Sequence, residues 1–367
     1  MSHRVFMTAL GIVCLLGCSN SPKRQETAAS QPAPPKPIGP IVEIKAPLGL
    51  PAVPVPAGNP PTAETVALGR KLYYDTRLSV DNTISCASCH HPLVGFSDGK
   101  PVSDGVKGGK GTRNAPVVMN AAYSTLQFWD GRAASLEKQA EGPVANPIEM
   151  GMTHEGVVKR LNDDPVYKAE FEKAFGSGPI TYDMAAMAIA SFERTAISAN
   201  SPFDRYFYGG DKKALSASAI RGLEVFRNPA KGNCAVCHTI EEKFALFTDN
   251  KFHNLGVGLN NKGELTDLGR FDATKADADR GAFKTPSLRN IALSGPYMHD
   301  GSHKTLKEVV DFYIGGGSSN DHLDKDIKAL TLNKQEREDL IAFLGSLTGE
   351  IPAGLDDPKS KKAEVAR

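Results

Sequence analysis

Two stretches decide the fold of this chain: Cys86-Ala-Ser-Cys89-His90 and Cys234-Ala-Val-Cys237-His238. Each has the spacing of a c-type haem attachment site, in which two cysteines bond the porphyrin and the next residue supplies an imidazole to the iron. The alternatives are a disulfide within each pair, or one zinc ion bound by four sulfurs. Neither alternative explains a histidine directly after both pairs. The sequence therefore predicts two covalently bound haems c, with His90 and His238 as iron ligands.

The N-terminus predicts export. After Arg4, an apolar run from Val5 to Leu16 is typical of a secretory signal and is too short to span a bilayer comfortably. The run ends in Leu15-Leu16-Gly17-Cys18, which resembles a bacterial lipobox. Residues 1–17 are therefore predicted to be a lipoprotein signal peptide, and Cys18 is predicted to be lipidated; plain secretion is the alternative. We expect a periplasmic protein that is lipid-anchored to the outer membrane.

Composition sets the limits of the folded part. Residues 18–61 are rich in Pro, Ala and Ser, and such a segment is predicted to be an extended tether because it buries little apolar surface. Residues 351–367 are predicted to be a polar tail. The residues between, 62–350, are enough for two compact domains. The formal net charge of +1 argues against a nucleic-acid partner.

A weak internal repeat supports two haem domains. Gly69-Arg-Lys-Leu-Tyr73 lies ahead of the first haem motif, and Gly222-Leu-Glu-Val-Phe226 lies ahead of the second. Each is typical of an amphipathic helix that leads into a haem loop. Further helices are predicted at Thr153, near Pro165, over Tyr182 to Ile197, and over Asn333 to Leu347 with an Asn333-x-x-Glu336 cap. We predict a mainly α protein with long Gly-rich loops and two cytochrome c-like domains, 62–205 and 206–350.

Iron coordination separates an electron carrier from an enzyme. A carrier needs both irons six-coordinate, whereas a peroxidase needs one open iron with an acid–base group beside it. Six further stretches bear on this choice: Arg113-Asn-Ala-Pro116, Gln127-Phe-Trp-Asp-Gly-Arg132, Gly142-Pro143 through Ile148-Glu-Met150, Phe252-His-Asn-Leu-Gly256, Thr285-Pro-Ser-Leu-Arg-Asn290 and Gly295-Pro-Tyr-Met-His-Asp-Gly301. With these stretches in this order, the chain from about Ala63 to Gly349 resembles the bacterial dihaem cytochrome c peroxidase family, which includes the MauG-type enzymes that mature methylamine dehydrogenase.

The resemblance implies roles for both haems and for two further side chains. The haem on His90 would react with peroxide, and the haem on His238 would transfer electrons. Trp129 matches the tryptophan that mediates electron transfer between the haems; a core aromatic is the alternative. Glu149 matches the distal carboxylate, which accepts a proton from peroxide and returns it to the leaving oxygen. A surface carboxylate is the alternative for Glu149.

The resemblance also implies a calcium site. Asn114 and the backbone carbonyls of Ser294 and Pro296 match the family's ligands, and oxygen atoms on loops suit calcium. An asparagine that caps a turn is the alternative. Two histidines in the family stretches are expected to have structural roles: His299 between the haems and His253 near the second haem.

Two positions depart from the common peroxidase pattern. Many family members have a histidine in the loop before the Arg-Asn stretch, which binds the first iron until the second haem is reduced. This chain has Val106 there, so the first haem is expected to be open without reductive activation. The methionine that commonly binds the second iron is matched by Tyr313, as in the MauG-type branch. A phenolate stabilises ferric iron; the alternative is that Tyr313 only packs and Met298 or another residue is the ligand.

Three functions follow as hypotheses. The first is a periplasmic peroxidase that reduces hydrogen peroxide with electrons from a small cytochrome c or cupredoxin. The second is a MauG-like oxidase that holds oxidising equivalents on both haems and modifies a protein substrate. The third is a non-enzymatic dihaem carrier, which an open first iron and Glu149 argue against. Peroxide-dependent haem oxidoreductase is the prediction common to the first two.

Overall fold

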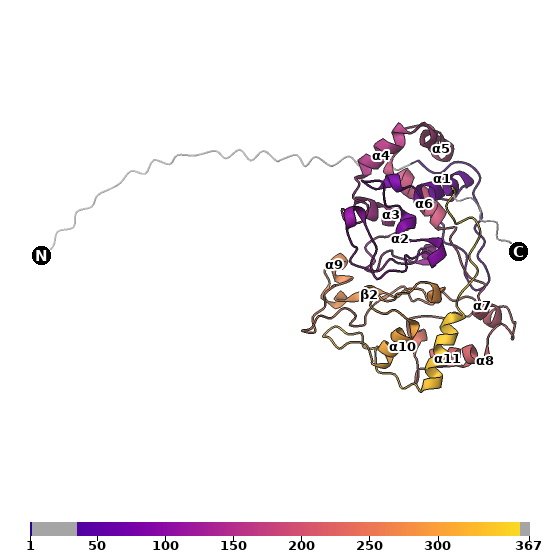
Figure 1. The fold of residues 1–367 in the computed structure, drawn as a ribbon, viewed down its shortest axis with the longest axis vertical. Helices are drawn as coiled ribbons and strands as arrows, with labels where there is room; N and C mark the ends of the chain where they lie inside the picture. The colour runs from indigo at the N-terminus through magenta and orange to yellow at the C-terminus, as the bar shows by residue number, and fades with distance from the viewer. Residues whose placement is uncertain (2–34, 360–367) are drawn as a thin grey trace. The chain divides into compact units, whose positions relative to one another are not determined.

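The same pair of packed helices occurs twice along the chain. In the computed structural model, which describes Met1 and residues 35–359, α1 (Ala63–Tyr73) packs against α6 (Tyr182–Glu193). Likewise α8 (Ala217–Arg227) packs against α11 (Lys334–Gly345). In Figure 1, β2 lies between the helices of the first half and the group formed by α8, α10 and α11.

Each helix pair crosses at a glycine. A Cβ atom at Gly69 of α1 would lie 1.8 Å from the carbonyl oxygen of Ala188, and one at Gly222 of α8 would lie 1.9 Å from the carbonyl oxygen of Asp339. Both distances are far inside van der Waals contact, so only glycine allows the backbones to approach this closely. The contact precedes each Cys-x-x-Cys-His stretch, as the predicted repeat requires.

The remaining elements confirm a mainly α fold. The other helices of the described residues are α2 (Cys86–Cys89), α3 (Leu136–Ala145), α4 (His154–Asp163), α5 (Pro165–Phe175), α7 (Pro202–Phe207), α9 (Phe271–Thr274) and α10 (Leu306–Ile314). Two short strands, β1 (Phe252–Asn254) and β2 (Ala282–Lys284), pair antiparallel with His253 opposite Phe283. None of the helices within the described residues has the length and apolar character that crossing a bilayer requires.

Helix ends follow local capping. Asn333 caps α11 through a capping box with Glu336, as predicted. The helix predicted over Tyr182 to Ile197 ends earlier, at Glu193. Beyond that point Asn120 takes over the backbone hydrogen bonds, because its amide nitrogen donates to the Ser198 carbonyl at 2.8 Å and its amide oxygen accepts from the Ser198 N–H at 2.9 Å.

Two hydrophobic clusters form the core of the folded part. The first is built largely on α1, α5 and α6 and includes Tyr73 and Phe192. The second is built largely on α8 and α11 and includes Phe226, Phe247 and Phe343, whose rings contact one another edge-on or tilted. Each cluster belongs to one helix pair; the exact domain limits at 62, 205 and 350 stay predictions.

The segment predicted to be a tether contacts the folded part at several points between residues 38 and 61. Its backbone pairs with α5 through Ile38 N–H to Ala174 O, at 2.9 Å. Leu50 is buried in a third cluster with Tyr123 and Ile197. The prediction of an extended tether up to residue 61 therefore fails at these contact points, although Ile41, Leu48 and Val55 remain exposed. Residues 2–34, with the predicted signal peptide and Cys18, lie outside the described residues.

The described part of the predicted polar tail also returns to the first half. Leu355 is buried in the first cluster, and its carbonyl accepts a hydrogen bond from the Tyr74 hydroxyl at 2.7 Å. Arg70 of α1 donates from Nε to the Asp356 carbonyl, also at 2.7 Å. The chain therefore crosses from the second helix pair back to the first before residue 359.

Candidate functional site

The second Cys-x-x-Cys-His stretch lines a cavity of about 520 Å³. Cys234, Cys237 and His238 all contribute to its wall, and all four described cysteines are unpaired, so neither predicted pair forms a disulfide. His238 Nδ1 lies 2.8 Å from the Phe247 carbonyl. A proton on Nδ1 leaves Nε2 free as an acceptor, which is the arrangement found in histidines that bind metals. The volume is within the range of cofactor cavities.

Both candidate ligands for the second iron reach this cavity. Tyr313 comes from α10 and Met298 from the loop before it, and both contribute to the wall that His238 also lines. Burial raises the pKa of Tyr313 well above its usual value, and the nearby sulfurs of Cys234 and Cys237 add to the shift. The phenol therefore keeps its proton unless a cation replaces it. Tyr313 stays the predicted ligand.

The first Cys-x-x-Cys-His stretch forms α2, at the end of which His90 is half-buried. Burial lowers the pKa of His90, so its imidazole is neutral, as metal binding requires. Its Nδ1 has no hydrogen-bond partner among the described residues. The Tyr73 hydroxyl of α1 donates to the His90 carbonyl at 2.8 Å and thereby connects the motif to the helix pair.

Val106 and Glu149 are brought together beside this first motif. The Val106 N–H donates to the Glu149 carbonyl at 3.0 Å, and the Val106 side chain is buried. Burial raises the pKa of Glu149, against the opposing effects of Arg132 and of a hydrogen bond from Asn146 Nδ2 to Glu149 Oε1 at 2.8 Å. Burial also raises the pKa of Cys89, and the charge of Glu149 contributes to that shift. Cys89 Sγ lies 4.0 Å from the carbonyl oxygen of Asp104, two residues before Val106.

Trp129 lies between the two halves of the chain. Its indole N–H donates to the Asn114 carbonyl at 2.9 Å, and its own carbonyl accepts from the Lys284 N–H of β2 at 2.8 Å. Its ring also lines the cavity at the second motif. The neighbouring Arg113 spans both halves, because it binds Asp130 at 2.6 Å and Asp267 at 2.7 Å.

The three residues predicted to bind calcium also line this cavity. Asn114, Ser294 and Pro296 all contribute to its wall. The Asn114 side-chain nitrogen donates to the Lys100 carbonyl at 2.8 Å. The side-chain oxygen Oδ1 takes no part in this bond and is the atom that could bind a cation. The Asn114 N–H donates to the His299 carbonyl at 2.7 Å. The three residues thus line one cavity from two separate loops, and calcium binding stays a prediction.

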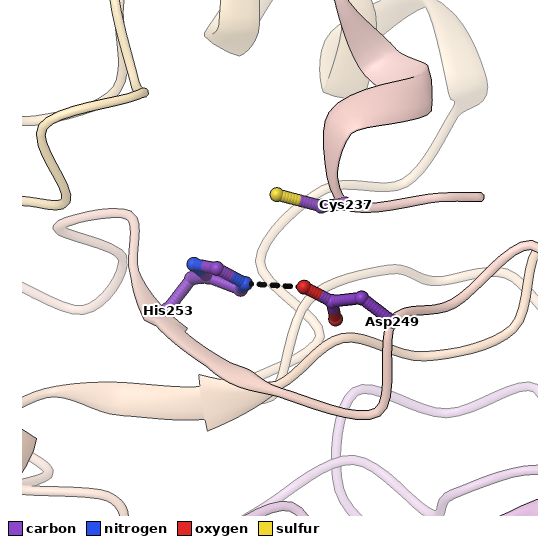
Figure 2. Close-up of side chains that lie close together, drawn as sticks. All are labelled: Cys237, Asp249 and His253. Carbon is purple, nitrogen blue, oxygen red and sulfur yellow. Dashed lines mark hydrogen bonds and ion pairs between the residues drawn. The ribbon is translucent and has the colours of Figure 1, made fainter.

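The two further histidines have different surroundings. His299 is buried and stacks on Phe283 with ring centroids 3.6 Å apart, and burial lowers its pKa to about 4. His253 lies between two carboxylates, with Nδ1 2.6 Å from Asp324 and Nε2 3.0 Å from Asp249. Figure 2 shows His253 and Asp249 beside the Cys237 sulfur. A contact with Cys237 is the largest cause, ahead of Asp324 and Asp249, that raises the pKa of His253 to about 10.

Comparisons with known proteins agree on one family. The family model of di-haem cytochrome c peroxidases matches residues 63–213. The chain is 43% identical to the methylamine utilization protein MauG of Methylorubrum extorquens, over 84% of each chain. It is 38% identical to a cytochrome c551 peroxidase of Nitrosomonas europaea, covering 82% of this chain and 85% of the relative. This chain belongs to the dihaem cytochrome c peroxidase family.

The fold of this dihaem peroxidase agrees with a solved relative. A crystal structure of a MauG-like protein associated with microbial copper homeostasis superposes with a TM-score of 0.76 at 35% identity, covering 85% of this chain and 98% of that one. The chain is therefore a haem peroxidase or related oxidoreductase with cytochrome c-like domains. Family membership implies haem c, and the neutral His90 and His238, the unpaired cysteines and the cavity all suit that group.

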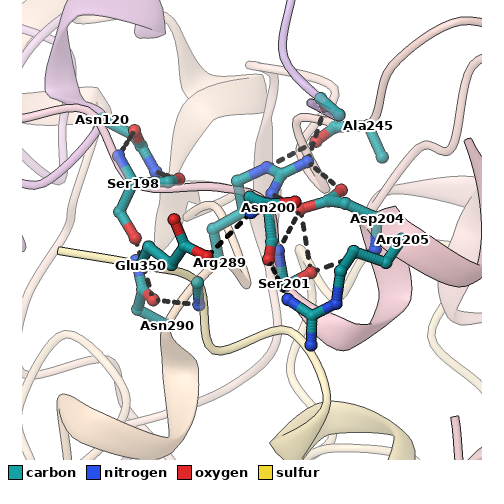
Figure 3. Close-up of polar contacts among 12 residues, drawn as sticks. Asn120, Ser198, Asn200, Ser201, Asp204, Arg205, Ala245, Arg289, Asn290 and Glu350 are labelled. Atoms are coloured by element: carbon teal, nitrogen blue, oxygen red, sulfur yellow. Dashed lines mark hydrogen bonds and ion pairs between the residues drawn. The ribbon is translucent and has the colours of Figure 1, made fainter. Parts of the chain in front are cut away.

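Arg289 and Asn290 belong to a quoted family stretch, but their partners could not be found from the sequence. Arg289, at 1% exposure, forms two bonds of 2.9 Å to Asp204, whose side chain is fully buried. The same guanidinium donates to the Gly49 and Ala245 carbonyls (Figure 3). Asn290 next to it accepts from the Gly349 N–H at 2.8 Å. Arg289 and Asn290 are the last two residues of the Thr285–Asn290 stretch. Through them this stretch is bonded to α7, to the segment before α1 at Gly49, and to Gly349 after α11.

Proposed function

We propose that this protein is a periplasmic dihaem c-type peroxidase, which reduces hydrogen peroxide to water with electrons from a small cytochrome c or cupredoxin. The observation that carries the proposal is the contact of Val106 with the backbone of Glu149. Where many family members have an iron-binding histidine, this chain has an aliphatic residue whose backbone is bonded to that of the predicted acid–base residue. The first haem is then free to take peroxide, and an acid–base group is beside it.

Glu149 supplies the proton transfer in this proposal. When bound, the haem on His90 supplies the metal at which the peroxide O–O bond is cleaved. The Glu149 carboxylate accepts a proton from peroxide and returns it to the departing oxygen, so one group acts as base and then as acid. Two electrons and two protons from outside complete the reduction of one peroxide to two waters. The raised pKa of Glu149 favours the return of the proton near neutral pH.

Electrons enter through the second haem in this proposal. His238 and Tyr313 are the predicted ligands of its iron, Cys234 and Cys237 attach it, and Trp129 relays electrons to the first haem. This route is supported by Trp129 and the second motif lining one cavity. Calcium bound by Asn114, Ser294 and Pro296 would hold the loops on which Trp129 rests, since Trp129 donates its indole N–H to Asn114.

A MauG-like oxidase that modifies a protein substrate is the second candidate. The specific observation in its favour is the position of Tyr313 at the cavity with His238, because tyrosine ligation is the pattern of that branch. The 43% identity to a MauG protein supports the same alternative. The two candidates share the open first haem and differ in whether electrons come from a small redox protein or from residues of a larger partner.

Electron paramagnetic resonance of the ferric protein as isolated tests the shared proposal. We expect one high-spin haem, the open first site, and one low-spin haem. Two low-spin haems in both the ferric and the half-reduced protein would contradict it and leave an electron carrier. Peroxide turnover with reduced cytochrome c then distinguishes the candidates, because the peroxidase should turn over rapidly and the MauG-like enzyme slowly.

Export and anchoring form a separate part of the proposal. The signal-like residues 1–17 and the lipobox at Cys18 support a lipoprotein held at the outer membrane with its haems in the periplasm. Labelled palmitate should be incorporated into the wild-type protein and not into Cys18→Ser. An unlabelled wild-type protein of mature size would indicate plain secretion.

A further inference from the structure

Lys284 brings a positive charge to the cavity of the second haem motif. It is the last residue of β2, it is partly buried, and it lines the cavity together with Cys237 and His238. Burial lowers the pKa of Lys284 to about 8, although the charge of Asp249 opposes the shift. A cation withdrawn from water in this way is costly unless an anion is beside it.

The other cations of the cavity already have partners or water. Lys231 binds Glu336 at 2.9 Å, and Arg289 binds Asp204. Lys328 is exposed. In the described part of the chain, the Lys284 ammonium makes no hydrogen bond or ion pair with a side chain.

Asp249, the carboxylate whose charge acts on Lys284, is hydrogen-bonded to other groups. Asp249 accepts from His253 at 3.0 Å and from the Lys251 N–H at 2.9 Å. Both bonds hold it on the side of Cys237, where Figure 2 shows it. An anionic partner for the Lys284 ammonium must therefore come from a group bound in the cavity.

We propose that the Lys284 ammonium forms an ion pair with a propionate of the second haem. This proposal rests on the proposed attachment of that haem to Cys234 and Cys237. Once its two vinyl groups are bonded to cysteine sulfur, the propionates are the anionic groups that a haem c carries at its periphery. A charge-assisted hydrogen bond to a propionate would satisfy the buried ammonium, and the ammonium would in turn neutralise a charge that enters the cavity with the cofactor.

The pair has a redox consequence. A positive charge near the porphyrin favours the reduced iron, which carries one positive charge fewer, so Lys284 raises the reduction potential of the second haem. This effect opposes the lowering by a tyrosinate ligand. Lys284 also donates its backbone N–H to the Trp129 carbonyl at 2.8 Å. Lys284 would therefore bind the haem propionate through its side chain and the Trp129 carbonyl through its backbone.

Potentiometric titration of the second haem in Lys284→Met tests the pair without peroxide. Methionine keeps the length of the side chain and the backbone bond to Trp129 but removes the charge. We expect the equilibrium constant for reduction of the second haem to fall about tenfold, which is about 59 mV for one electron. Lys284→Arg should retain the wild-type potential. Lys328→Met, which removes an exposed lysine from the same cavity wall, should leave it unchanged.

An unchanged potential in Lys284→Met would overturn the proposal. The haem content of each variant gives a second measurement if methionine interferes with haem attachment. Loss of haem in Lys284→Met and Lys284→Gln, with retention in Lys284→Arg, would support the pair, because the charge is the shared difference. Loss of haem in all three variants would contradict the ion pair, because haem attachment would then depend on the shape of the lysine side chain and not on its charge. A protein without peroxidase activity could still show the shift, so the two proposals fail separately.

Discussion

Trp129 donates its indole N–H to the backbone carbonyl of Asn114 at 2.9 Å. The predicted relay between the haems is thus bonded directly to a predicted calcium ligand. The Asn114 N–H is in turn bonded to the His299 carbonyl at 2.7 Å, which lies in the stretch that carries Pro296. The position of the tryptophan ring therefore depends on the same two loops that would bind the ion.

Replacing Trp129 with phenylalanine should separate peroxide binding from electron transfer. Phenylalanine retains an aromatic ring but loses the N–H bond to Asn114 and the easily oxidised indole. We expect peroxide to react with the first haem as in the wild type, while reoxidation of the pre-reduced second haem slows by orders of magnitude. Stopped-flow spectra of the second haem measure this, and an unaltered rate would exclude Trp129 as the relay.

Glu149→Gln should keep both haems but slow peroxide cleavage by about 10²- to 10⁴-fold, the usual effect of losing a general acid–base group. The wild type should also have a pH limit. Burial raises the pKa of Glu149. As the pH falls, Glu149 is therefore protonated at a higher pH than an exposed glutamate would be. The rate should fall with it, and this limb should be missing from the pH profile of Glu149→Gln.

Val106→His should close the first haem. The side chain at this position is buried, next to the Glu149 backbone, so an imidazole there would reach the space that peroxide needs. We expect the high-spin signal of the first haem to convert to low-spin and peroxide reduction to require prior reduction of the second haem. Val106→Leu is the matched control and should remain high-spin. Persistence of the high-spin signal in Val106→His would place Val106 away from the iron.

Tyr313→Phe tests the second iron's ligand. Phenylalanine preserves the packing of α10 but cannot bind metal. We expect the ferric phenolate absorption of the second haem to vanish and its reduction potential to rise, because phenolate stabilises ferric iron. Met298→Leu provides the control at the other side chain in the cavity wall. If only the control alters the low-spin spectrum, methionine is the ligand.

Arg289→Met should destabilise the protein strongly. It leaves Asp204 buried without its partner, and breaking such a pair costs about 3–5 kcal/mol. Urea denaturation of the holoprotein should show a lower midpoint. The exposed pair Lys159–Asp163 is the control, because its removal should cost about 0–1 kcal/mol. Equal midpoints for Arg289→Met and Asp163→Asn would show that the buried network adds no stability.

Local patterns predicted most of the helices well. The Asn333 cap and the helices before each haem motif depend on neighbours in sequence, and they lie where they were expected. The packing of residues 38–61 was not predictable from composition, because a proline-rich arm is stabilised by a surface built from distant residues such as Tyr123 and Ile197.

The candidate site shows the same division. Glu149 and Trp129 could be singled out because they occur within recognisable stretches. Pairings between distant residues could not be singled out: Asp324 binds His253 across 71 positions, and Lys284 attracts notice only when the cavity is known. Single charged residues in loops carry no periodic pattern, so their partners appear only when the chain is folded.

The glycines at positions 69 and 222 restrict how this enzyme can evolve or be redesigned. Each allows a carbonyl oxygen of the opposing helix to occupy the space where any other residue would place its first side-chain carbon. The close approach of the helices at each crossing therefore depends on retaining glycine. The two helix pairs keep the same geometry while the loops around them differ in sequence. Reprogramming either metal centre is a matter of exchanging loop segments, with both helical supports left untouched.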